Sequence, residues 1–504
     1  MEENALRIPP PDRDLTDVDL AGGELRQGAL FNTITLVAAN FRSIFTFLVA
    51  RLLGAAALGV FSVAWATTDL FSKIGIFGLD DTITTFIARS EAAGNRVRSR
   101  ALFRTTVIFG ITLSLFTTAI VVGCVRFFGE RLGFQQEMIS PLAVLLCAMP
   151  GIALYRISNG VSRGMKIMHH DIYSRGITDS VATTIAFLIV FLLGFRLFAP
   201  EIAAVAGSAA SGIVAFAFAA RLFRDVPSES TGASQPELGP LLGYAFPIGA
   251  YQFLNALILR IDVIMLGWFI DRAPGVTLTT VGIYGVALGI ANSLRRVNHA
   301  FNPIFAPIMA EMTATGAQER AAATYARLAQ WMLWLLLPAL AVMIFAGDFI
   351  LWLYGAVFRQ GSGWLCILAL ACAIEAYVGF GETIIMVQRP SLNLLNSIIT
   401  CVIAAVANIL LIPRFGVTGA AFGILIPYFT QGVLRFFALR FVFKWRSSWR
   451  NIAPPVIAAV IAFLPALALY SFFTGISAQI LGAGIFLILF GACWKYHSWR
   501  AAVA

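Results

Sequence analysis

The sequence predicts an all-α integral membrane protein of about fourteen transmembrane helices, built as two six-helix pseudo-symmetric halves around a central cavity plus a C-terminal helix pair. Hydrophobic residues make up 59% of the 504 residues and charged residues only 12%, whereas a soluble chain carries about 25% charged residues. The apolar residues fall in blocks of about 20, the length of a helix that crosses a hydrocarbon core. The alternation that membrane-spanning strands need is absent.

Each expected span is one of these apolar blocks. In order, they cover residues 29–50, 58–79, 102–124, 139–162, 176–198, 202–222, 241–268, 281–305, 328–346, 363–387, 392–412, 417–439, 452–473 and 476–494. The stretches between them divide the chain into a cytoplasmic N-terminal segment (1–28), an N-terminal six-helix half (29–222), a cytoplasmic linker (223–240), a C-terminal six-helix half (241–440) and helices 13 and 14 with a short cytoplasmic tail (441–504). The last two spans hold no charged residue, so we expect them to pack outside the cavity, against lipid.

Basic residues predict the orientation of these spans. With the N-terminus inside, the basic cluster between Arg89 and Arg104 and most other arginines and lysines fall on the cytoplasmic side. This positive-inside bias predicts that both termini are cytoplasmic. The formal net charge of +10 therefore reflects topology, and we expect no nucleic-acid partner. The arginines that fall outside are Arg51, Arg126, Arg131, Arg196, Arg272, Arg359 and Arg414.

Several patterns typical of metal sites and soluble enzymes are missing. The six cysteines lie in or beside apolar blocks without a CxxC spacing, and the four histidines are scattered. No P-loop or HExxH motif occurs. The outside loops are also too short to hold a catalytic domain. We therefore expect no enzyme activity, no catalytic residue, no metal ion and no cofactor.

The chain also repeats itself. Gly59–Ala64, at the start of the second span, has the pattern of Gly282–Ala287, at the start of the eighth span, 223 residues later. Each half holds six spans, so the halves share one orientation and form parallel repeats about an axis along the membrane normal. Repetition of this kind is typical of alternating-access transport, with the substrate between the halves.

Several segments carry a resemblance to a known family. They are Ala50–Gly54, Leu58–Phe61, Phe77–Leu79 and Ile87–Arg89 in the first half, and Arg260–Gly267 and Gly282–Tyr284 in the second. In order and spacing they resemble the Wzx-type polysaccharide flippases of the multidrug/oligosaccharidyl-lipid/polysaccharide (MOP) exporter superfamily. The resemblance implies flipping of an undecaprenyl-diphosphate-linked oligosaccharide across the bacterial inner membrane for cell-surface polysaccharide synthesis. It also implies membrane lipids and glycan polymerases as partners. By analogy with the lipid II flippase branch of the superfamily, we expect a groove for the polyprenyl tail beside the last two helices.

Cations inside the spans predict a charged cavity. Each one costs about 2.5–3.5 kcal/mol at a helix centre, so such residues usually face water or a polar substrate. At the 223-residue offset Lys73 corresponds to Arg296, which places cations at equivalent points of both halves. Guanidinium groups offer paired donors that match phosphate oxygens, so these cations are candidate ligands of the diphosphate. The candidates are Arg42, Lys73, Arg156, Arg260, Arg295 and Arg296.

Acids inside the spans admit two hypotheses. In one, an acid binds a coupling cation, H⁺ or Na⁺; in the other, the acids balance the arginines inside a sealed core. Asp69 lies one turn before Lys73, and Asp262 lies close to Arg260 in sequence, which favours these pairings. The candidates are Asp69, Asp262, Glu375 and Glu382.

Three other functions fit parts of the sequence. A lipid II flippase has the same expected fold. A cation-coupled multidrug antiporter of the superfamily has fewer helices and an acid-dominated cavity. A membrane scaffold without transport activity does not need cations at equivalent positions of both halves, and these duplicated cations favour the oligosaccharide flippase.

Overall fold

The computed structural model describes residues 18–131, 133–226, 238–314, 318–443, 449–472 and 475–503. All regular elements in these ranges are helical, which confirms the all-α fold class. The α-helices are α1 (Val18–Ile76), α2 (Leu79–Ala92), α3 (Arg96–Phe128), α4 (Gln136–Leu146), α5 (Met149–Gly164), α6 (His169–Asp171), α7 (Asp179–Leu192), α8 (Ala199–Arg221), α9 (Leu238–Trp268), α10 (Leu278–Ala314), α11 (Gln318–Phe345), α12 (Gly347–Tyr354), α13 (Ser362–Gln388), α14 (Pro390–Phe437), α15 (Trp449–Phe472) and α16 (Ile476–Val503). Four shorter turns, π-helical or 3₁₀, are η2 (Ile172–Thr178), η3 (Arg196–Phe198), η4 (Ala356–Gly361) and η5 (Ala438–Val442).

Eleven helical stretches within the described residues are long and apolar enough to cross a membrane. Two of them, Ser43–Ile76 and Ser391–Val442, are interrupted at Gly54 and Gly416, so α1 and α14 each hold two expected spans. Both glycines have a positive φ, 83° and 57°, which residues with a Cβ rarely adopt. Helix α10 contains the eighth expected span. The chain is therefore a multi-pass membrane protein with helices in the predicted order.

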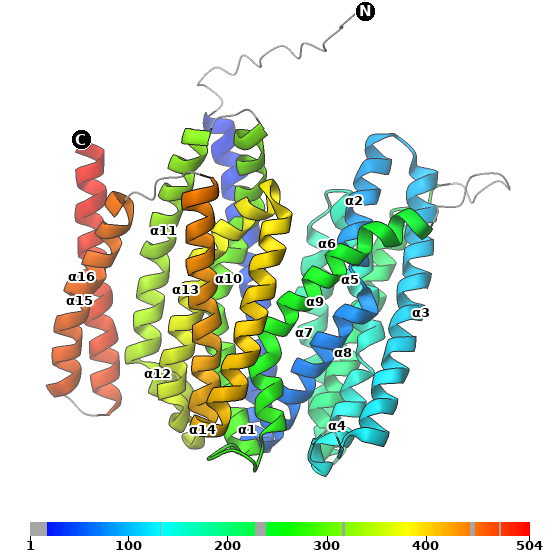
Figure 1. The fold of residues 1–504 in the computed structure, drawn as a ribbon, viewed down its shortest axis with the longest axis horizontal. Helices are drawn as coiled ribbons and strands as arrows, with labels where there is room; N and C mark the ends of the chain where they lie inside the picture. The colour runs from blue at the N-terminus through cyan, green and yellow to red at the C-terminus, as the bar shows by residue number, and fades with distance from the viewer. Residues whose placement is uncertain are drawn as a thin grey trace, which may run out of the picture.

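The helices form two groups (Figure 1). Helices α2 to α8 gather on one side and α10 to α14 on the other, while α1 and α9 run between them. Helices α15 and α16 pack against each other and against α11, at the outer edge of the second group. The start of α1 and the end of α16 lie at the same end of the molecule, here called the terminal end (Figure 1).

At the opposite end the helices α1 and α10 are in backbone contact. A Cβ atom on Gly59 would lie 2.0 Å from the Leu278 carbonyl oxygen, and one on Gly282 would lie 1.9 Å from the Ala55 carbonyl oxygen. Leu278 is the repeat equivalent of Ala55, as Gly282 is of Gly59, so each half presents the same surface to the other. This symmetric glycine contact confirms the pseudo-symmetric halves, and only glycine permits so close an approach.

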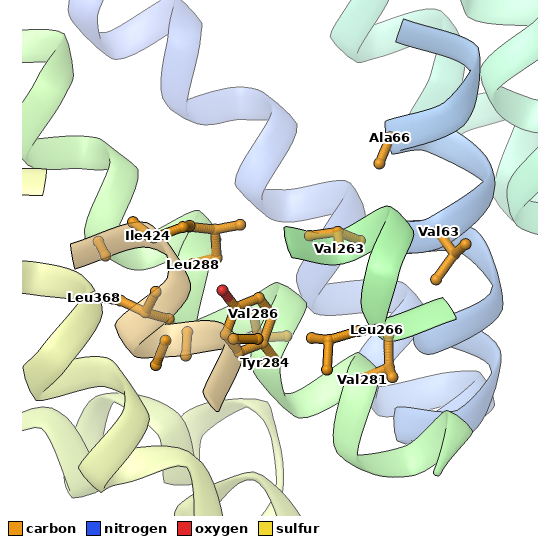
Figure 2. Packing of buried hydrophobic residues seen from close by; sticks show 14 of the residues in the cluster. Val63, Ala66, Val263, Leu266, Val281, Tyr284, Val286, Leu288, Leu368 and Ile424 are labelled. Carbon is orange, nitrogen blue, oxygen red and sulfur yellow. The ribbon is translucent and has the colours of Figure 1, made fainter. Parts of the chain in front are cut away.

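A hydrophobic core surrounds the symmetric glycine contact. A Cβ atom on Gly267 of α9 would lie 2.5 Å from the Val63 side chain, so these helices also pack closely. The core therefore joins helices from both groups. Figure 2 shows ten of its labelled members: Val63 and Ala66 of α1, Val263 and Leu266 of α9, Val281, Tyr284, Val286 and Leu288 of α10, Leu368 of α13 and Ile424 of α14.

Helix α9 contacts both groups along its length. Near its start, Leu241 and Ala245 join a buried cluster formed by α2, α3, α5 and α8 of the first group. Near its end, Val263 and Leu266 lie in the core shared with α1 and α10. The first helix of the expected C-terminal half is thus bound to both halves.

The C-terminal helix pair is fixed to the rest of the protein by polar contacts at the start of α16. Gln479 Nε2 donates to Asp348 Oδ2 at 2.9 Å, and the backbone N–H of Phe349 donates to Gln479 Oε1 at 2.8 Å. Arg359 Nη2 donates to the same Asp348 oxygen at 2.8 Å. Hydrogen bonds from Arg359, and in smaller measure from Gln479, lower the pKa of Asp348 despite its partial burial.

Candidate functional site

Most of the charged residues expected inside the spans lie in two groups, one beside α1 and one on α10 and α13. Arg42 belongs to α1, but it lies outside the residues whose side chains the structure describes. The first group contains Lys73 of α1, Arg156 of α5 and Arg260 of α9. The second contains Arg295 and Arg296 of α10 with Glu375 of α13. Asp262 and Glu382 have other partners, Tyr284 and Arg435 respectively.

Arg260 links the halves by a salt bridge to α1. Its Nε donates to Asp69 Oδ2 at 2.9 Å. The sequence favoured Asp262 as the partner of Arg260 and Lys73 as the partner of Asp69, and the structure gives a different pairing. Residues two apart on a helix point to nearly opposite sides, whereas residues three or four apart share a face. Arg260 therefore reaches α1 while Asp262 faces α10.

Lys73 and Arg156 lie beside this salt bridge. Arg156 Nη1 is 3.6 Å from Asp80 Oδ2, and its buried Nε has no hydrogen-bond partner among the described residues. Lys73 feels the charges of Arg156, Asp69 and Asp80, but it forms no salt bridge within the described part of the chain. A partly buried cation without a salt bridge of its own is costly. The first half thus carries positive charge that an anion would stabilise.

Asp80, at the start of α2, is held from both halves. In addition to Arg156, Gln252 of α9 donates through Nε2 to Asp80 Oδ1 at 3.1 Å and to Asp81 Oδ2 at 2.8 Å. Burial raises the pKa of Asp80, but Arg156 and Gln252 outweigh this effect and hold the pKa below its ordinary value. Asp80 is therefore a carboxylate at neutral pH and keeps Arg156 in place.

In the second half Arg295 is held on several sides. Its Nε donates to Glu375 Oε2 at 2.7 Å, and its Nη1 lies 3.4 Å from Asn292 Oδ1. The guanidinium also lies 5.7 Å from the ring centre of Tyr428, a cation–π contact. The side chains of Arg295 and Glu375 are only 15% and 13% exposed. This geometry is the one expected if Glu375 balances the charge of Arg295.

Arg296 follows on α10 with a half-buried side chain that has an interaction of its own. Because consecutive helical residues point about 100° apart, Arg296 presents its charge to a different side of α10 from Arg295.

Glu382 has a partner that the sequence analysis did not single out. Arg435 of α14, which is 1% exposed, donates through Nη2 to Glu382 Oε2, and the Tyr251 hydroxyl of α9 donates to Oε1. The remaining nitrogens of Arg435, Nε and Nη1, have no partner among the described residues. The position of Arg435 inside the expected span 417–439 was a usable signal.

Asp262 is the one of the four candidate acids that forms no salt bridge within the described residues. It is fully buried, and Tyr284 donates to its Oδ2 at 2.6 Å. Its Oδ1 has no hydrogen-bond partner in the described part of the chain. A buried carboxyl without a counter-charge favours a bound proton or cation. Among the described residues, no cluster of three or more side chains suited to hold a metal ion occurs.

A serine–histidine pair elsewhere in the first half is structural. Gly160–Gly164 reads GVSRG, the spacing of a serine nucleophile motif, and Ser162 Oγ lies 2.9 Å from His170 Nδ1. That motif works at an exposed turn between a strand and a helix. Ser162 instead lies inside α5 and is 1% exposed, so no substrate reaches it.

A cavity of about 270 Å³ lies between α11, α15 and α16. Its walls are hydrophobic side chains, so it suits an apolar ligand rather than a sugar or phosphate. Its lining includes Leu337, Leu340, Val456, Phe463, Leu464 and Phe486.

Known proteins share this fold. A family model described as "Polysaccharide biosynthesis protein" matches residues 25–313. The lipid II flippase MurJ in an inward closed conformation is 12% identical, with a TM-score of 0.69 over 94% of this chain and 100% of that chain. An inward-facing multidrug resistance MATE family transporter of the MOP superfamily is 14% identical, with a TM-score of 0.67 over 82% of this chain and 98% of that one. A MOP superfamily transporter from Pyrococcus furiosus, described as having a binding pocket of reverse polarity, is 14% identical, with a TM-score of 0.59 over 82% and 94% of the two chains. No curated protein sequence matches the chain significantly.

Proposed function

Because the chain belongs to the polysaccharide biosynthesis protein family and has the fold of the MOP-superfamily membrane transporters, we propose that it flips a polyprenyl-diphosphate-linked oligosaccharide across the bacterial inner membrane. Alternating access of the two halves moves the diphosphate and sugars for cell-surface polysaccharide synthesis. The positive-inside bias supports cytoplasmic termini. A glycan polymerase that extends the exported units is the partner this activity requires.

The observation that carries this proposal is the positive charge at equivalent positions of both halves. Asp69 engages Arg260 and Glu375 engages Arg295, so these two cations are largely neutralised by the protein. Lys73 forms no salt bridge with a described residue, and Arg296 is its repeat equivalent. A diphosphate near the pseudo-twofold axis is therefore approached by one cation from each half.

The acids and the apolar cavity complete the proposal. Asp262, which no arginine holds, is the candidate site of a coupling H⁺ or Na⁺. The cavity between α11, α15 and α16 is the candidate site for part of the polyprenyl tail, since its walls are hydrophobic.

Substitution of Arg296 tests the proposal. In cells that depend on this protein for glycan export, Arg296→Ala should abolish export at normal protein levels. Arg296→Lys should retain part of it, because the charge remains but the paired donors do not. Full export by both variants would remove Arg296 from the site.

The internal repeat provides a second and more specific test of the proposal. If Lys73 and Arg296 bind the same diphosphate, the free-energy losses caused by Lys73→Ala and Arg296→Ala should not be additive. Two residues at one site are commonly coupled by about 0.5–3 kcal/mol. Export rate, or affinity for the lipid-linked diphosphate, is measured for each variant and for the double variant. Strict additivity would show that the two cations act separately.

A lipid II flippase is the second candidate, favoured by the match to MurJ over 94% of this chain. Complementation separates the two functions. Rescue of a strain that lacks its lipid II flippase would favour this candidate, whereas rescue of oligosaccharide export alone would favour the first.

A further inference from the structure

A fourth cation stands in the first half, in a segment that the sequence places at the edge of the membrane. Arg175 belongs to η2, the π-helical turn Ile172–Thr178 at the start of the fifth span. The η2 turn packs against α1, and the exposed Arg175 guanidinium lies close enough to Lys73 for their charges to repel. Lys73 also feels the charge of Arg156. The charge of Lys73 on α1 is thus opposed by two further cations, one on α5 and one on η2, and both of these elements pack against α1.

The π-helical turn itself is held in place by α5. Asn159, which is 2% exposed, donates through Nδ2 to Asp171 Oδ1 at 2.7 Å. Ser174 Oγ lies 3.0 Å from Asn159 Oδ1, so a single amide binds the residues on either side of the start of the turn. Asn159 lies three residues after Arg156 and therefore shares its face of α5.

The wider turn determines where Arg175 points. A π-helical turn holds one extra residue, which rotates the following side chains by about 100° relative to a continuous α-helix. The Thr178 hydroxyl donates to the Tyr173 carbonyl at 2.8 Å, five residues back, and covers a carbonyl of the widened turn. Such turns occur frequently at functional sites. Here the turn brings a guanidinium to the side of α1 that carries Lys73.

The balance of charge around these cations leaves room for an anion. The acids whose charges act on Lys73 are Asp69 and Asp80, and each already has an arginine, Arg260 and Arg156 respectively. Arg175 forms no salt bridge within the described residues, and neither does Lys73. The buried Nε of Arg156 is a further donor without a partner in the described part of the chain. Cations held together without enough carboxylates are stabilised by a phosphate-like ligand.

We propose that Arg175, Lys73 and Arg156 form a phosphate site in the first half, and that the π-helical turn η2 exists to place Arg175 in it. This inference rests on the proposed function, because the phosphate in question is one of the two in the lipid-linked diphosphate. Arg175 contacts the ligand, and Asn159 is a positioning residue that acts through η2.

The test measures binding of inorganic pyrophosphate to the purified full-length protein by calorimetry, together with export in cells. Arg175→Ala should weaken pyrophosphate binding about tenfold or more, the effect of losing one charge-assisted contact. Arg175→Lys should recover part of the affinity. The matched control is Arg104→Ala, which removes an exposed arginine of α3 and should change neither binding nor export.

The role of Asn159 has its own readout. Asn159→Ala should weaken pyrophosphate binding in the wild-type background, yet it should change nothing further when Arg175 is already Ala. An additive loss would show that Asn159 acts on the fold in general and would refute its positioning role. Thermal unfolding and gel filtration of each variant establish that the fold is intact.

Competition identifies the source of the phosphate. A soluble polyprenyl diphosphate should displace pyrophosphate, whereas nanodiscs enriched in phosphatidylglycerol should not. If the anionic nanodiscs compete instead, the site binds membrane headgroups and the inference is wrong. If Arg175→Ala behaves as Arg104→Ala while Lys73→Ala and Arg296→Ala abolish export, the inference fails and the proposed function stands. If none of Arg175→Ala, Lys73→Ala and Arg296→Ala affects export, the proposed function fails as well.

Discussion

Replacing Gly282 by alanine tests the symmetric glycine contact that joins the two halves. The added Cβ would lie 1.9 Å from the Ala55 carbonyl oxygen and 2.9 Å from the backbone nitrogen of Gly59. Carbon and oxygen atoms of packed helices approach to about 3.3 Å, so α1 and α10 must separate by more than about 1 Å. Both obstacles are backbone atoms, and no rotamer change relieves them. Overpacking of this kind costs about 1–3 kcal/mol.

That cost falls only on the arrangement in which the halves touch, so it shifts the equilibrium toward separated halves by about 5- to 150-fold. Spin labels are placed at the exposed positions Leu197 of η3 and Val357 of η4 in a cysteine-free background. They report the distance between the two helix groups at the end opposite the terminal end. We expect Gly282→Ala to lengthen the distance distribution and to lower the export rate. By symmetry Gly59→Ala should give the same result.

The matched control for this prediction is Gly289→Ala, a change on the same helix. A Cβ there has no atom within 4 Å, so the change should leave distance and export unaltered. Identical distributions for Gly282→Ala and Gly289→Ala would refute the idea that the glycine contact holds the halves together.

Three further predictions test other parts of the molecule. Arg295→Ala leaves Glu375 buried without its counter-charge, so we expect a loss of about 3–5 kcal/mol in unfolding free energy, partly restored by adding Glu375→Gln; an unchanged thermal melt would contradict this. Because folding lowers the pKa of Asp348, its stabilisation is present above its ordinary pKa of 3.8 and is lost as the pH falls below that value. The wild-type Tm should therefore fall more than that of Asp348→Asn between about pH 5 and about pH 3. Parallel Tm-against-pH curves for the two proteins would contradict this prediction. In intact cells an impermeant thiol reagent should label Gln135→Cys but not Arg96→Cys, and the reverse pattern would overturn the proposed orientation.

The positions of the spans were predictable because block length and the cost of charges in lipid decide them locally. The repeat was also visible, since Gly59 and Gly282 open equivalent helices with similar sequences. The contact between the two equivalent helices was visible only in the structure. Sequence similarity does not say that each of the two glycines packs against the helix of the other. The sequence predicted the helix breaks at Gly54 and Gly416 only approximately, from the polar or small residues around them.

Salt-bridge partners were not predictable, because they join helices that are distant in sequence. Arg260 and Asp69 are 191 residues apart, and Arg435 and Glu382 are 53 apart. Proximity in sequence favoured Asp262 for Arg260, yet residues two apart on a helix face different neighbours. The sequence places Arg175 just before the fifth expected span, and sequence patterns rarely reveal a single π-helical turn such as η2.

Adjacent residues of α9 hold opposite halves of the protein, which has a mechanical consequence. Gln252 binds the carboxylates of α2, and Tyr251 binds Glu382 of α13. Any rotation of one half against the other therefore tends to bend this helix. Pro247 lies within the helix one turn earlier and removes a backbone hydrogen bond there, so the bend concentrates at that point. A change in the angle between the halves must therefore bend helix α9 or break one of these side-chain contacts.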